Sequence, residues 1–281
     1  MQFFKKIVDF YIFSNIHVAL AGFCLTKITL IKFGNENNLT PLFVALSIII
    51  SYNFIRFFEI KYKRLQWFKK WFFNHKRSLL LLVVLSIVLL GYITFFYSFN
   101  LKAVVILFPF AFMTLFYVVP LFKIKNNEFS FRNFPSIKIF SIAIAWAGIT
   151  VFFPLYERGS EFTSEILIVF FQRLLILISI TLPFDIRDVN IDSKQLKTLP
   201  QLFGVNSSKI IGYVLLLIVI FLENMKENNI VTYNYILVII AVIIGMFLTF
   251  SSPKRSRYYT SFWVEAIPIF WYGLIVLFLN S

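Results

Sequence analysis

The sequence predicts an all-α, polytopic membrane protein with about nine transmembrane helices. Hydrophobic residues make up 59% of the 281 residues, and only 14% are charged. The mean hydropathy is +0.82. A soluble domain could not bury this much apolar surface, whereas membrane helices pair their own backbone groups and expose apolar side chains to lipid. No linker interrupts the chain, so we expect a single membrane domain over residues 1–281.

Nine apolar segments are each long enough to cross a hydrocarbon core of about 30 Å at about 1.5 Å per residue. Turn-forming residues separate several of them, including the run before Pro41, Asn126 with Asn127, and Ser252 before Pro253. We place the segments near residues 9–31, 41–60, 78–98, 101–122, 136–155, 163–183, 207–223, 231–251 and 262–280.

Basic residues mark one side of the predicted bundle. The N-terminus and every second loop hold most of the 27 Lys and Arg residues, including the dense run at 61–77. The positive-inside rule then predicts a cytoplasmic N-terminus and an external C-terminus. We expect the membrane to be a bacterial inner membrane. The net charge of +14 is therefore attributed to loops that face the lipid bilayer and the cytoplasm, and no nucleic-acid partner is expected.

Three of the chain's thirteen acidic residues lie between two apolar segments, at Asp185, Asp188 and Asp192. On a helix, this spacing places the second and third within about 60° of the first. Carboxylates on one face suit Mg²⁺, which substrate phosphates often complete. The alternative is a solvated loop whose carboxylates pair with Arg187 and Lys194, and the spacing leaves both interpretations open.

The pattern Asp185-x-x-Asp188-x-x-x-Asp192, followed by Lys-Thr-Leu-Pro at 197–200, resembles the second Asp-rich motif of the UbiA superfamily of membrane prenyltransferases. The resemblance extends to the predicted helix count and to the cytoplasmic placement of the motif. It implies a UbiA-like bundle that transfers a prenyl group from a prenyl diphosphate to a lipophilic or aromatic acceptor. It also implies Mg²⁺ on the three aspartates as the catalytic centre, with Arg187 and Lys197 near the diphosphate.

The family's other motif reads Asn-x-x-x-Asp-x-x-x-Asp at the cytoplasmic end of the second helix. Here Asn53 fits, but Phe57 and Lys61 stand at the two Asp positions. Glu59 lies about 200° from Phe57 around a helix and should not replace the missing carboxylate. We expect Asn53 and Lys61 to contact diphosphate, with Arg56 assisting. The alternative is a non-catalytic protein of this fold that binds an isoprenoid or lipid.

Other polar residues carry less specific signals. Arg132 and Lys138 could contact diphosphate, but setting the orientation in the membrane is the favoured interpretation. Tyr117 is interpreted as an interfacial anchor. Arg173 lies in the middle of an apolar segment and requires a partner or a polar cavity, which the sequence does not identify. His17 is expected to be an interior polar residue, because it has no metal-ligand spacing with other residues.

Overall fold

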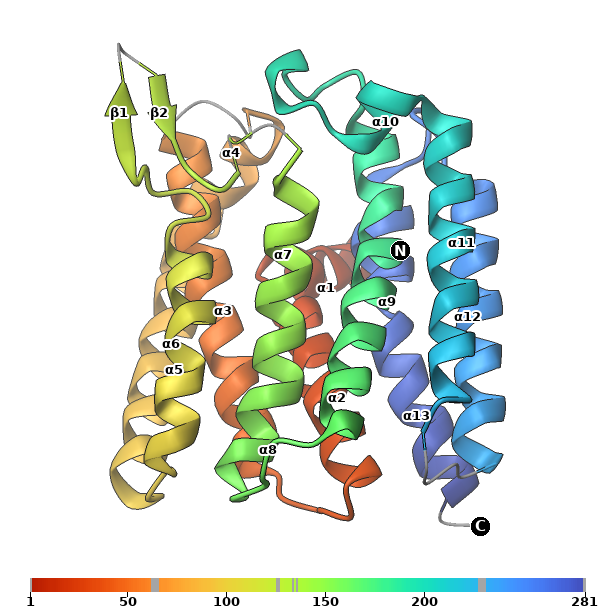
Figure 1. Ribbon diagram of the computed structural model, residues 1–281. Coiled ribbons are helices and arrows are strands. Elements are labelled where there is room, and N and C mark those ends of the chain that lie inside the picture. Colours follow the sequence, from red (N-terminus) through yellow and green to blue (C-terminus); the bar gives the residue numbers. More distant parts are fainter. Residues whose placement is uncertain are drawn as a thin grey trace.

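Helices run side by side and form almost all of the protein (Figure 1). This computed structural model describes residues 2–61, 66–124, 127–132, 134, 136–226 and 231–279. Within these ranges, seven helices are long and apolar enough to cross a membrane. A bent pair makes an eighth span, and the shorter apolar helix Leu101–Leu115 lies beside them. The prediction of an all-α membrane bundle is confirmed.

The first half of the bundle contains long helices that lie side by side, together with the short helix α4 at one end (Figure 1). Asn100 caps one of them, because its side chain accepts a hydrogen bond from the backbone N–H of Lys102. In chain order these elements are α1 (Gln2–Phe13), α2 (Ile16–Lys32), α3 (Leu39–Lys61), α4 (Gln66–Asn74), α5 (Lys76–Phe96), α6 (Leu101–Leu115) and the hairpin β1 (Phe122–Ile124) with β2 (Asn127–Phe129).

The second half continues the same pattern, and α9 packs against α7, α11 and α12. Most of α9's inward side chains are fully buried, whereas α5 exposes a run of Leu and Val side chains that suits contact with lipid. These elements are α7 (Lys138–Ala147), η1 (Gly148–Phe152), α8 (Phe153–Glu157), α9 (Ser164–Asp188), η2 (Lys194–Leu196), α10 (Leu199–Phe203), α11 (Val205–Glu223), α12 (Val231–Phe250), η3 (Tyr259–Val264) and α13 (Ile267–Leu279).

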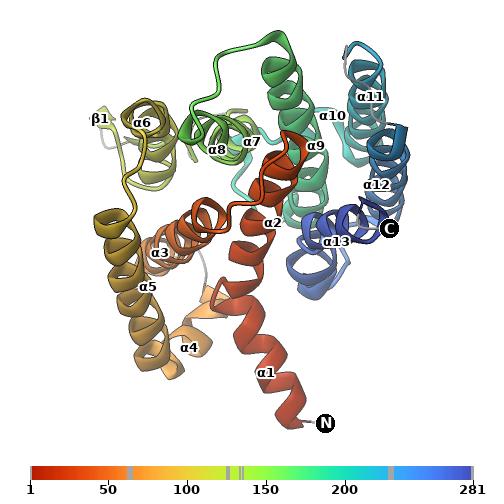
Figure 2. The ribbon, with the colours of Figure 1, turned by 90° about the horizontal axis from the view of Figure 1, so that it is seen from below.

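The first predicted segment, 9–31, is not one helix. The chain breaks at Asn15, whose φ of 73° is left-handed, and α1 is inclined by 58° to α2. Asn tolerates this conformation better than most residues, which explains why the break falls there within an apolar run. Figure 2 shows α1 projecting away from the bundle. The side chain of Asn53 on α3 supports the break, because its Nδ2 donates to the Ser14 carbonyl at 3.0 Å.

Two of the spans contain a turn of π-helix, η1 within the span Lys138–Glu157 and η3 at the start of the last span. Such wider turns often accompany functional sites. Beside η1, a Cβ added to Gly148 would lie 2.2 Å from the ring of Phe110 on α6. Glycine is therefore required where α6 crosses η1.

Arg173, in the middle of α9, is buried, and the partners that the sequence left unidentified are neutral. Its guanidinium donates to the Leu25 carbonyl at 2.9 Å and to the hydroxyl of Thr29 at 3.2 Å. The Trp271 ring lies 5.2 Å from the guanidinium carbon. Hydrogen bonds and an aromatic face thus offset the cost of placing this cation inside the bundle.

Candidate functional site

A cavity of about 290 Å³ opens at the end of the bundle that carries α4, the hairpin and α10. Its lining has two parts. Charged side chains come from α3, α7 and α9, together with Arg132 from the segment before α7 and Glu265 from just after η3. The apolar part includes Val18, Ala21, Leu177 and Ile180, from α2 and α9. A charged end above an apolar floor is the lining that a ligand with an ionic head and a hydrocarbon tail would require.

Helix α3 contributes Tyr52, Arg56 and Glu59 to the cavity, which recur at the spacing of one helical face. The expected diphosphate contacts Asn53 and Lys61 lie elsewhere. Asn53 does not line the cavity, because its amide donates to the backbone carbonyls of Ser14 and Ile49. Lys61 is exposed, and Phe57 is 51% exposed rather than placed in the cavity. The residues that match the first Asp-rich motif therefore lie on a different face of α3 from the residues that line the cavity.

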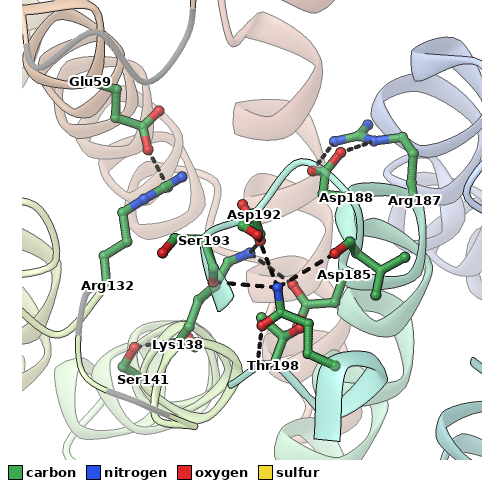
Figure 3. Close-up of polar contacts among 12 residues, drawn as sticks. Glu59, Arg132, Lys138, Ser141, Asp185, Arg187, Asp188, Asp192, Ser193 and Thr198 are labelled. Carbon is green, nitrogen blue, oxygen red and sulfur yellow. Dashed lines mark hydrogen bonds and ion pairs between the residues drawn. The ribbon is translucent and has the colours of Figure 1, made fainter. Parts of the chain in front are cut away.

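The last turn of α9 carries Asp185 and Asp188, and both line the cavity. Asp185 is 1% exposed. Lys138, the first residue of α7, donates from Nζ to Asp185 Oδ1 and to Asp192 Oδ2, each at 2.8 Å (Figure 3). A carboxylate at a helix C-terminus and an ammonium at a helix N-terminus both oppose the helix dipole. Pairing Lys138 with Asp185 stabilises both charges, so both groups can stay ionised where they line the cavity.

The turn after α9 is folded by its own polar groups. The backbone N–H of Asp192 donates to the Asp188 carbonyl at 2.8 Å, and Gln201 Nε2 donates to the Asp192 carbonyl at 3.0 Å. Thr198 and Gln201 form the capping box that begins α10. Lys197, an expected diphosphate contact, is exposed, has a left-handed φ of 47° and does not line the cavity.

Arg187, an expected diphosphate contact, lines the cavity and is paired with the neighbouring aspartate. Its Nε donates to Asp188 Oδ1 at 2.8 Å and its Nη2 to Oδ2 at 2.6 Å. Its Nη1 donates to the hydroxyl of Thr260 on η3. The π-helical turn therefore positions this arginine, and the same segment brings Ser261 and Glu265 to the cavity wall.

Arg132 was expected to set the membrane orientation, yet its guanidinium lines the cavity and pairs with Glu59 (Figure 3). Tyr117 is buried rather than anchored at the interface, with its ring 5.9 Å from the guanidinium carbon. Burial lowers the pKa of Arg132, but Tyr117, Glu59 and Asp192 outweigh burial and raise it. Arg132 therefore stays charged. One feature of the sequence marks the face of α3 that lines the cavity. Arg56 and Glu59 stand at i and i+3 near the end of a mostly apolar helix.

The three aspartates do not form a shared Mg²⁺ site in this arrangement. Among the described residues, no three His, Cys, Asp or Glu side chains are grouped so that they could hold a metal ion. Lys138 lies between Asp185 and Asp192, and Arg187 holds Asp188. Asp185 does retain one buried oxygen, Oδ2, that has no hydrogen-bond partner.

The fold resembles that of a known membrane enzyme. A solved structure described as a digeranylgeranylglyceryl phosphate synthase in membranes superposes with a TM-score of 0.54 and covers 97% of this chain and 96% of its own. The two sequences are 16% identical. No protein-family model and no curated protein matches the sequence. The similarity shows that this chain shares the fold of that protein over nearly its whole length.

Proposed function

We propose that this protein transfers a prenyl group from a prenyl diphosphate to a lipophilic or aromatic acceptor, at the cytoplasmic side of the membrane. The observation that carries the proposal is the two-part cavity, which lies in a fold shared with a prenyltransferase. The four cations at its charged end are Arg56, Arg132, Lys138 and Arg187. These groups suit the diphosphate, and the apolar floor suits the first part of the prenyl chain.

The reaction would need little covalent help from the protein. The bond between C1 of the prenyl group and the diphosphate oxygen breaks, a bond from C1 to the acceptor forms, and the acceptor loses a proton. Fixed cations stabilise the negative charge that grows on the leaving diphosphate. The apolar floor keeps water from the allylic cation. Asp185 Oδ2 is a buried acceptor available for the proton of an acceptor hydroxyl.

The second candidate is a non-catalytic protein of the same fold that binds an isoprenoid or lipid. One observation favours it: Asp185, Asp188 and Glu59 are each already paired with a cation of this chain. A diphosphate must therefore compete with carboxylates for the cations that would hold it. The Mg²⁺ requirement stays a prediction, and we derive no step through the metal because the aspartates are held by Lys138 and Arg187.

Transfer and binding can be separated in one experiment. Purified protein in lipid vesicles receives radiolabelled geranylgeranyl diphosphate with a mixture of phenolic and glycerol-phosphate acceptors, with and without Mg²⁺. The proposal predicts a labelled lipid product together with released diphosphate, and loss of both in Asp185→Asn. Saturable binding without product in any mixture would favour the second candidate instead.

A further inference from the structure

A second, larger cavity shares a wall with the charged one. This groove, of about 420 Å³, lies between α3 on one side and α6, α7 and η1 on the other. Two residues line both spaces: Tyr52 on α3 and Trp146 on α7. Figure 2 shows how these helices surround this side of the bundle. The charged cavity and the groove are therefore neighbours that share this pair of side chains.

Tyr52 and Trp146 close this wall by touching each other. The indole Nε1 of Trp146 donates to the Tyr52 hydroxyl at 3.0 Å. The ring centroids are 6.0 Å apart and the ring planes are at 89°, which is an edge-to-face contact. Both residues are only half-buried. One hydrogen bond and one ring contact thus join Tyr52 to Trp146, and side-chain rotation can separate the two side chains.

The chemistry of the groove identifies its occupant as hydrocarbon. Its wall is formed mainly by aliphatic and aromatic side chains. The Ser and Thr hydroxyls that reach it donate within their own helices. Ser47 donates to the Phe43 carbonyl at 2.8 Å, Ser51 to the Ser47 carbonyl at 2.7 Å, and Thr114 to the Phe110 carbonyl at 2.9 Å. No donor from these residues remains for a polar ligand, so an apolar chain fits the space best.

We propose that the Tyr52–Trp146 pair is a gate that sets the length of prenyl chain the protein accepts. The proposal rests on the proposed function, because the diphosphate must lie in the charged cavity. With the pair closed, a short chain is confined to the apolar floor of that cavity. With the pair open, a longer chain continues into the groove and buries further apolar surface there.

Substitutions in the gate should therefore change how affinity depends on chain length more than they change the affinity for short chains. Only a chain that reaches the groove has to break the bond between Trp146 and Tyr52. Tyr52→Phe removes that bond and keeps the ring. Since one such hydrogen bond contributes modestly to stability, the ratio of long-chain to short-chain affinity should rise about threefold to tenfold.

A second variant narrows the groove without touching the gate. Ala111 on α6 is exposed and lines the groove but not the charged cavity. Ala111→Phe should fill the space and lower the same affinity ratio by about tenfold, because the distal part of a long chain loses its binding surface. The matched controls are Tyr92→Phe and Leu80→Phe on α5, where both side chains are exposed.

The test measures dissociation constants of geranyl, farnesyl and geranylgeranyl diphosphate for the detergent-solubilised full chain and these four variants. We expect the geranylgeranyl-to-geranyl affinity ratio to rise in Tyr52→Phe, to fall in Ala111→Phe and to stay unchanged in both controls. A ratio that stays within about twofold of wild type in both test variants overturns the gate but leaves the proposed function intact. If no diphosphate of any length binds the folded wild type, the proposed function itself fails.

Discussion

Replacing Lys138 by methionine tests the central ion pair of the site. The substitution keeps an apolar stem of similar length but removes the ammonium that contacts Asp185 and Asp192, each at 2.8 Å. Asp185 is 1% exposed, so its carboxylate would be left buried without its partner. Removing one member of a buried pair typically costs about 3–5 kcal/mol. For a chain of this size, that corresponds to a fall in Tm of roughly 10 °C.

Thermal unfolding in detergent measures this loss, and a double-mutant cycle assigns it. Lys138→Met with Asp185→Asn removes both charges, so it should be more stable than Lys138→Met alone. Lys61→Met is the control, because Lys61 is exposed. If Lys138→Met unfolds at the wild-type temperature, Asp185 does not depend on this lysine and the arrangement of the site is wrong.

Three further predictions concern the cavity and the packing of the helices around it. Arg132→Gln should weaken geranylgeranyl diphosphate binding about tenfold or more in equilibrium binding, since a charge-assisted contact is lost; unchanged affinity would remove Arg132 from the site. Asn53→Ala should lower the unfolding free energy by about 1–3 kcal/mol, because two buried hydrogen bonds are lost. The comparison variant Lys61→Ala should change neither stability nor diphosphate affinity. Gly148→Ala should reduce Tm, because its Cβ would meet the Phe110 ring; a Tm equal to wild type would show that the ring yields freely.

The bundle itself was largely predictable, because its helices are apolar over lengths that only a membrane requires. The break at Asn15 was not. The apolar run continues on both sides of it, and periodicity does not distinguish a helix from two helices joined by one left-handed residue. The signal was local: an Asn within an apolar segment is one of the few residues that adopts a positive φ at low cost.

Two of the three aspartates named from the sequence line the charged cavity, whereas two of its cations were expected to set the membrane orientation instead. Asp185 and Asp188 line the cavity because their spacing within one helix fixes their common face. Lys138 and Arg132 reach the same cavity from sequence positions about fifty residues away, a contact that helical spacing cannot reveal. On α3, the resemblance favoured the face of Asn53 and Lys61, whereas Arg56 and Glu59 lie on the face that lines the cavity.

These differences share a physical cause. In a membrane helix, a buried charge is costly, so ionisable residues at the ends of different spans find each other across the bundle. Two such pairs join residues distant in sequence, Glu59 with Arg132 and Asp185 with Lys138. The sequence shows the charges but not their partners, and the partners determine which carboxylates are free to hold a metal ion.

The most direct measurement is equilibrium binding of radiolabelled geranylgeranyl diphosphate to the purified wild-type protein, with and without Mg²⁺, followed by competition with unlabelled inorganic diphosphate. A ligand held by the cations above the apolar floor should bind saturably, be displaced by inorganic diphosphate, and bind more weakly to Arg132→Gln. Folded protein that shows no saturable, displaceable binding under either condition would contradict the assignment of this cavity to a prenyl diphosphate.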